Sequence, residues 1–339
     1  MLDARARAQA RCTTYRLLAE LVTNGATPGH LATLEALDGW LLEPWSAAGA
    51  SPDLDLLALT HHQLFALGVF PYAGVFLAPS ACAGASADEV RSCWDRAGFR
   101  PRLDALTADH LGLELAFLSF VTGARAEALE DRRPELAVTL DEIAAEFLDT
   151  CVLSWLPAMV VAARDLLPPP SSETSLEGVA LRFWVGVLEG ALEVSAEHRG
   201  CCVGPRRGPE LAPQAEILVA ADTGLREIAA HLSTPACSGL FLSRADIARI
   251  GRRADVPRGF GARALELENL LRSAVELGAW APVLRALSEC VDARAEDLRA
   301  LAVHTELSVS VRPWLQVLAG TREQVATLLE SWDGSRASA

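Results

Sequence analysis

The chain has 339 residues, of which 51% are hydrophobic and only 6% aromatic, and its formal net charge at pH 7 is −14. This length is enough for one large domain or two ordinary domains with a sizeable core. The negative charge argues against a general nucleic-acid-binding protein, which needs a basic face to displace counterions from phosphates. Ala, Leu, Glu and Arg dominate, and these residues lose little on entering a helix, so the composition predicts an all-α protein.

Helix signals recur along the chain, with their usual start and stop residues. The last signal before a proline-rich break at 168–172 is a long helical segment that Pro157 should kink or split. Ser86 and Glu89 have the spacing of a capping box, and Thr321 and Gln324 have the same spacing. We expect helices at 4–22, 52–67, 86–98, 107–123, 134–167, 176–196, 214–232, 243–254, 262–278, 280–290, 294–303 and 321–332.

Glycine and proline between 200 and 213 indicate a linker. We therefore predict a helical domain over residues 1–200 and a second, smaller helical domain over residues 214–339, with the linker at about 200–213. The apolar stretches at 56–87 and 150–163 do not read as membrane spans, since the first contains prolines and histidines and the second is too short. The first residues lack the apolar run of a signal peptide, and we expect a cytoplasmic protein.

Most motifs of enzyme and metal chemistry are absent from the sequence. The chain has no lysine, which excludes a Walker-type phosphate loop, and it contains no G-x-G-x-x-G after a strand, no H-E-x-x-H and no G-x-S-x-G. Its eight cysteines form no C-x-x-C pair, and the adjacent Cys201 and Cys202 have poor geometry for binding one zinc ion. We therefore predict no catalytic residue, no cofactor and no metal.

One helix start contains an unusual set of polar residues. His110 and Glu114 are four residues apart and so share a helix face, and Asp109 lies just before them. A glutamate on an apolar face needs a partner, and His110 is the nearest candidate. The simpler interpretation is that Asp109 caps the helix and His110 is an ordinary first-turn residue.

The aromatic-rich stretch 64–77 and the segment 109–115 together resemble the signature of the TorD/DmsD/NarJ family of redox-enzyme maturation chaperones. In that family an L-F-x-x-G…P-P-Y-E-S-V-Y-L loop precedes an E-P-x-D-H-[IL]-x-x-E-L helix. The matching residues here are Leu64-Phe65, Phe70-Pro71-Tyr72, Val75-Phe76-Leu77 and Asp109-His110-Leu111-Gly112-Leu113-Glu114-Leu115. Ala73-Gly74 replaces the Glu-Ser of the family, and Leu106-Thr107 replaces its Glu-Pro. The resemblance implies a TorD-like helical bundle, to which residues 214–339 add a C-terminal extension.

The resemblance also implies a function. Such a chaperone binds the twin-arginine leader, or a nearby segment, of a molybdopterin-dependent oxidoreductase subunit and holds that subunit for cofactor insertion. The implied protein is a monomer or a domain-swapped dimer. We expect an open trough with an apolar wall, carboxylates for the arginines and His110 as a pH-sensitive donor. Its residues are Phe65, Phe70, Tyr72, Phe76, Asp109, His110, Glu114 and Trp155.

Two other interpretations stay open. One is a helical adaptor that holds an enzyme subunit through residues 214–339 without recognising a leader. The other is a small-molecule enzyme that uses Asp109, His110 and Glu114 as acid and base, which would require a closed pocket and displaced pKa values.

Overall fold

The computed structural model describes residues 3–37, 39–78, 84–102, 106–168, 175–212, 216–220 and 222–337. The described residues form helices and turns, without a strand, and one isolated antiparallel bridge pairs Tyr72 with His110. The prediction of an all-α fold is therefore confirmed. The chain divides into two compact units, one made of Met1–Gly74 with Cys82–Gly208 and the other of Val75–Ala81 with Pro209–Ala339. The short segment Val75–Ala81 leaves the first unit and joins the second, which the sequence did not indicate.

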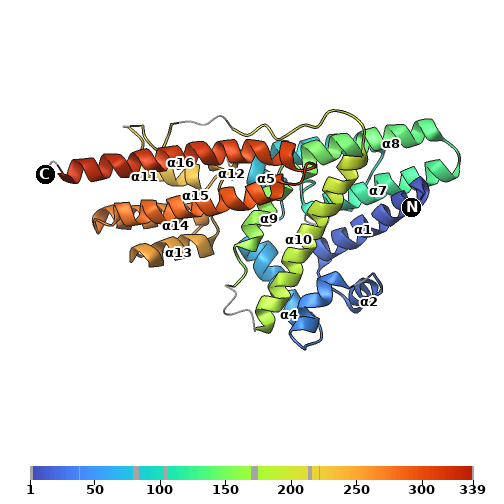
Figure 1. Ribbon diagram of the computed structural model, residues 1–339, viewed down its shortest axis with the longest axis horizontal. Helices are drawn as coiled ribbons and strands as arrows, with labels where there is room; N and C mark the ends of the chain where they lie inside the picture. The colour runs from blue at the N-terminus through green and yellow to red at the C-terminus, as the bar shows by residue number, and fades with distance from the viewer. Residues whose placement is uncertain are drawn as a thin grey trace. The chain divides into compact units, whose positions relative to one another are not determined.

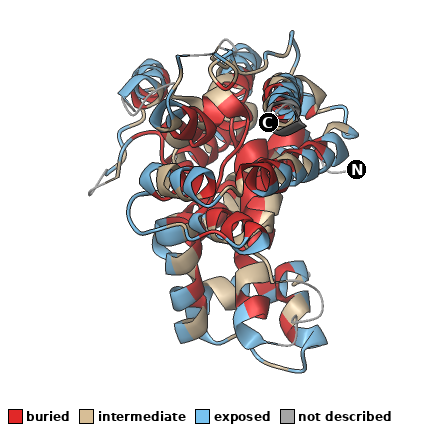
Figure 2. Ribbon diagram, turned by 90° about the vertical axis from the view of Figure 1, so that its left-hand side faces the viewer, coloured by how far each residue is buried: buried red, intermediate tan, exposed pale blue. Residues whose placement is uncertain are grey.

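The first unit is a bundle in which α1, α7, α8 and α10 are the long elements (Figure 1). Buried residues gather on the sides of the helices that face one another, as Figure 2 shows. The elements of this unit are α1 (Ala4–Asn24), α2 (Pro28–Ala36), η1 (Trp40–Leu42), α3 (Glu43–Ala47), α4 (Leu54–His62), the π-helical turn η2 (Gln63–Gly68), α6 (Gly84–Ala97), α7 (Leu111–Glu130), α8 (Pro134–Phe147), the π-helical turn η3 (Leu148–Val152), α9 (Leu156–Arg164) and α10 (Leu176–Cys201). The helix α5 (Ala73–Leu77) starts in this unit and ends in the other.

Helices α1 and α7 pack closely along their length. Their close approach requires a glycine, because a Cβ atom on Gly112 would lie 2.0 Å from the Thr23 hydroxyl oxygen and 3.1 Å from the Ala19 carbonyl oxygen. Tyr15 and Leu21 lie on the buried side of α1. The first turn of α7 is therefore held against α1, which fixes the segment that contains Asp109 and His110.

The predicted helix at 134–167 is divided, as Pro157 indicated. Pro157 lies in the first turn of α9, where its missing N–H breaks no helical hydrogen bond. Among the described residues no single helix is long and apolar enough to span a membrane. Pro134–Val152 and Leu156–Arg164 reach that length and apolarity only as a pair, and this pair is bent by 46°.

A buried ion pair joins η3 to the end of α10. The Arg199 Nε and Nη2 atoms donate to the Asp149 carboxylate at 2.8 and 3.0 Å, and both side chains are almost fully buried. The same guanidinium donates to the Pro205 carbonyl at 2.8 Å, and the Arg207 N–H donates to Asp149 at 3.1 Å. This network fixes the backbone just after α10.

The second unit has its own core. Helices α15 and α16 pack along each other, α13 lies against α14 and α15, and α11 lies against α14 (Figure 1). Ser243 and Asp246 form a capping box at the start of α13. The elements are α11 (Leu225–Leu232), α12 (Pro235–Ser238), α13 (Arg244–Ala254), α14 (Arg263–Glu276), α15 (Trp280–Ala302) and α16 (Ser308–Ala337).

Several predicted helix ends are wrong. Ser86 does not cap a helix, since α6 already begins at Gly84. The helices expected at 280–290 and 294–303 form one continuous helix, α15. Thr321 lies inside α16 and donates its hydroxyl to the Ser238 carbonyl at 2.8 Å instead of capping a helix. Of the helix expected at 214–232, only Leu225–Leu232 is helical among the described residues.

Candidate functional site

The structure brings the aromatic-rich stretch and the start of α7 together. The Leu111 N–H donates to the Pro71 carbonyl at 2.9 Å, and the Ala73 N–H donates to the Asp109 carbonyl at 3.0 Å. The rings of Tyr72 and His110 meet edge to face with their centroids 4.9 Å apart. The two segments that carry the family signature therefore form one local structure.

Asp109 holds the aromatic-rich stretch in place. Its side chain is buried, and its Oδ2 atom accepts a hydrogen bond from the Gly74 N–H at 2.9 Å. The other oxygen accepts from the Thr107 hydroxyl at 2.6 Å. Both carboxylate oxygens thus have partners within this chain. A contact between Asp109 and an arginine of a bound peptide stays a prediction.

His110, and not Asp109, caps α7. Its Nδ1 atom accepts a hydrogen bond from the Gly112 N–H at 3.1 Å, which satisfies one of the free donors at the helix start. Burial lowers the pKa of His110 to about 4, although the charge of Asp109 acts in the opposite direction. The ring is therefore neutral near pH 7, and because Nδ1 accepts, its proton lies on Nε2. The expected role of His110 as a donor to a bound peptide stays a prediction.

Glu114 is fully buried, and its partner is Trp155 instead of His110. The Trp155 Nε1–H donates to the Glu114 Oε2 atom at 3.3 Å, while Oε1 has no hydrogen-bond partner in the described part of the chain. Burial raises the pKa of Glu114 well above its ordinary value, and the charge of Asp109 raises it further. A fully buried and incompletely paired carboxyl is more stable in its protonated form.

Two of the predicted wall aromatics are core residues. Phe65 is buried and meets the rings of His61 and Trp184 edge to face. Phe76 is fully buried in the second unit, where it stacks on Phe241 with the ring centroids 5.3 Å apart. The guanidinium of Arg263 lies 4.2 Å from the centroid of the Phe241 ring.

The predicted residues that reach the surface are Phe70, which is 37% exposed, and Tyr72, which is half-buried. Sequence reasoning missed Leu67, which is 56% exposed at the end of η2. The spacing gave no signal for this exposure, because Leu67 lies three residues after the buried Leu64 and that spacing predicts a shared helix face. We name Leu67, Phe70 and Tyr72 the apolar strip. The other predicted residues are buried, and the expected open trough stays a prediction.

The acid–base interpretation finds little support in this geometry. Asp109 accepts hydrogen bonds from a backbone N–H and a hydroxyl, and His110 accepts one from a backbone N–H. Glu114 accepts one from the indole N–H of Trp155. Each polar group therefore has a structural role that explains its presence.

Comparison with known protein families identifies a match over part of the chain. Residues 26–161, which are less than half of the chain, match the family described as nitrate reductase delta subunit. The matched range includes the aromatic-rich stretch, the start of α7 and Trp155. No curated protein and no solved structure matches the chain.

Proposed function

Since residues 26–161 belong to the nitrate reductase delta subunit family, whose members are NarJ/TorD-like chaperones of redox-enzyme maturation, we propose that this protein escorts a molybdopterin-dependent oxidoreductase subunit. In this proposal the chaperone works in the cytoplasm, binds the twin-arginine leader or a nearby segment of the subunit, and holds the subunit for cofactor insertion. It is not an enzyme.

The observation that carries the binding site is the apolar strip on a rigid support. Phe70 and Tyr72 lie in a segment that is fixed to the start of α7 through backbone hydrogen bonds and through Asp109. A preformed aromatic surface binds a peptide at a low entropic cost. Such a peptide has an apolar stretch for the strip and arginines that suit a chain with a net charge of −14.

The energies rank the contacts. An aromatic anchor in a partly desolvated surface is worth about 2 kcal/mol. An exposed contact between arginine and carboxylate is worth under about 1 kcal/mol. We therefore expect aromatic truncation to weaken binding more than the removal of a surface charge.

Titration calorimetry of the full chain tests this proposal. The probe is a synthetic twin-arginine leader of a molybdopterin oxidoreductase subunit from the same organism. Phe70→Ala and Tyr72→Ala should each weaken binding by more than about tenfold, because tenfold corresponds to about 1.4 kcal/mol. Phe120→Ala is the matched control, since Phe120 is an equally exposed aromatic on α7 outside the apolar strip. The proposal fails if the unchanged chain does not bind the leader, or if the control weakens binding as much as the strip variants.

The adaptor alternative keeps one supporting observation. Phe260 is 91% exposed in a loop of the second unit, between Gly259 and Gly261, which both have positive φ angles. A side chain this exposed is accessible to a partner protein. If the protein is an adaptor, Phe260→Ser abolishes capture of the oxidoreductase subunit and leaves leader binding unchanged. Truncation near residue 205 would be less informative, since it removes the partners of the buried Phe76.

A further inference from the structure

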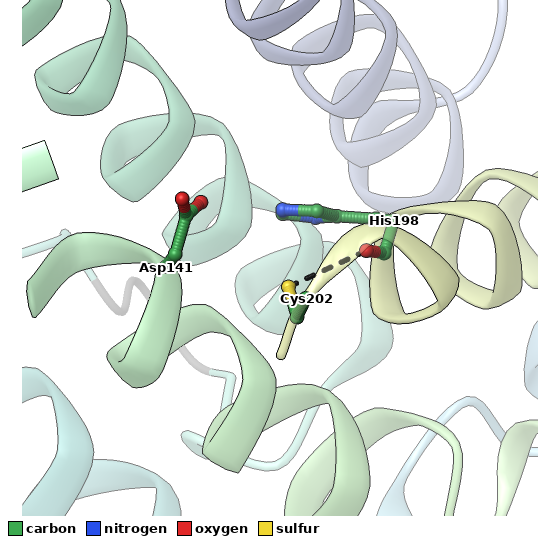
Figure 3. Close-up of side chains that lie close together, drawn as sticks. All are labelled: Asp141, His198 and Cys202. Atoms are coloured by element: carbon green, nitrogen blue, oxygen red, sulfur yellow. Dashed lines mark hydrogen bonds between the residues drawn. The ribbon is translucent and has the colours of Figure 1, made fainter. Parts of the chain in front are cut away.

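A cluster of side chains that can bind a metal ion lies in the first unit, and it includes no residue of the apolar strip. Asp141, His198 and Cys202 each offer one ligand atom, and these atoms all lie within 4.8 Å of one another. In Figure 3, the ring of His198 reaches from the end of α10 toward Asp141 of α8, and Cys202 lies below this ring. His198 is buried, and the other two side chains are partly exposed, so the cluster lies near the surface.

The backbone explains why these atoms converge. His198 and Cys202 are four residues apart at the end of α10, and residues at this spacing share a helix face. Two ligands at this spacing on one helix form a frequent chelating pair for zinc. The Cys202 thiol donates to the His198 carbonyl at 3.4 Å, which holds the sulfur beside the ring. Asp141 supplies the third group from a different helix.

The imidazole of His198 is arranged as a metal ligand requires. Its Nδ1 atom lies 3.2 Å from the Tyr15 hydroxyl oxygen, and that hydroxyl donates to the Val194 carbonyl at 3.4 Å. In the tautomer that carries its proton on Nδ1, this nitrogen donates to the Tyr15 hydroxyl and Nε2 offers its lone pair to a metal. Histidine ligands ordinarily have such an outer partner on the second ring nitrogen.

We propose that Asp141, His198 and Cys202 bind one divalent transition-metal ion of the zinc class. Oxygen, nitrogen and sulfur ligands together suit zinc, and three protein ligands leave a fourth position for water. The ion would fasten α8 to the end of α10, beside the backbone that Arg199 fixes.

The charged groups around the proposed site determine which proton must be lost when a metal binds. Arg125 pairs with Asp141 at 2.6 Å, and the second carboxylate oxygen suffices for a metal. The groups that act on Cys202 are Asp141 on α8, Arg11 on α1, and Arg199 and Cys201 on α10. Cys202 donates as a thiol to the His198 carbonyl, so its S–H bond breaks as the bond between sulfur and metal forms. The thiol proton passes to the solvent, and the resulting thiolate with Asp141 neutralises a doubly charged ion.

Metal titration of the full chain tests the proposal. The protein is stripped with a chelator and then titrated with Zn²⁺ or with Co²⁺, whose thiolate complexes show a charge-transfer band. We expect about one ion per chain, a cobalt–thiolate band and release of about one proton from the thiol. Cys202→Ser should abolish the band and weaken zinc binding by more than about tenfold. Cys201→Ser is the matched control, since it removes the adjacent thiol, and it should keep both.

Two results would overturn the proposal. One is zinc uptake by the Cys202→Ser variant equal to that of the unchanged chain. The other is a cobalt band that survives Cys202→Ser and disappears in Cys201→Ser. Because Cys202 is partly exposed at the end of a helix, its substitution should leave the fold intact, and circular dichroism of each variant verifies this.

Discussion

Substitution of Glu114 by glutamine tests the account of the buried carboxyl beside Trp155. The two side chains have the same shape, and the amide oxygen can still accept from the Trp155 Nε1–H. The other oxygen of Glu114 has no partner in the described structure, and in the variant the NH₂ of the amide takes its place. The comparison is therefore between a neutral amide and a protonated carboxyl. At a pH below the ordinary glutamate pKa of 4.5, the two proteins should differ in unfolding free energy by less than about 1 kcal/mol.

The difference should grow with pH, and its sign follows from proton binding. The pKa of Glu114 is raised in the folded state, so above pH 4.5 the folded chain holds a proton that the unfolded chain has released. The unfolding free energy of the unchanged protein then falls as pH rises, until the pH passes the folded-state pKa. The fall is at most about 1.4 kcal/mol per pH unit, and glutamine does not show it. Glu114→Gln should therefore become the more stable protein as the pH rises.

Urea unfolding over a series of about pH 5 to pH 8 measures this difference. The lowered pKa values of His110 and His198 make the folded protein more stable as the pH rises. The variant and the unchanged protein both contain these histidines, so this contribution cancels in the comparison. Glu127→Gln, at an exposed position of the same helix, controls for the change in net charge. A difference between Glu114→Gln and the unchanged protein that stays constant over this range would refute the reasoning, since it would mean that Glu114 is ionised and paired in the folded chain.

Three further substitutions probe the packing of each unit. Asp149→Asn leaves the buried Arg199 without its opposite charge and should cost about 3–5 kcal/mol in urea unfolding, and a cost under about 1 kcal/mol would show that the pair is open to solvent. Phe76→Ala should lower the calorimetric stability of the second unit by about 3–5 kcal/mol, and an effect on the first unit alone would contradict its assignment. Gly112→Ala forces a Cβ atom against the Thr23 hydroxyl and should cost about 1–3 kcal/mol by the same unfolding assay, whereas a stabilised variant would rule out the close approach of α1 and α7.

Much of the local structure follows from the sequence alone. The helix expected at 4–22 is observed as Ala4–Asn24, and the one expected at 176–196 is observed as Leu176–Cys201. Pro157 begins α9, as its missing N–H requires. The predicted ends of α15 and α16 were wrong. A capping pattern such as Thr321 and Gln324 destabilises the interior of a helix little when its polar groups have hydrogen-bond partners. Thr321 finds one in the Ser238 carbonyl.

The candidate site was less predictable than the helices. The resemblance to a known family indicated that the aromatic-rich stretch and the start of α7 belong together, and their backbone hydrogen bonds show that they do. It did not indicate which side chains reach the solvent. Whether Phe70 and Tyr72 contact a client peptide stays a prediction.

The sequence by itself determined the helical class, the position of most helices and the family signature, because helix propensity, proline and side-chain spacing act over a few residues. Only the tertiary structure decided that Glu114 accepts a hydrogen bond from Trp155 and that Phe76 packs on Phe241 in the second unit. The same holds for the short distances between Asp141, His198 and Cys202. Each of these contacts joins residues far apart in the chain. Burial and the pKa values that depend on it are set by such distant neighbours, and no local pattern records them.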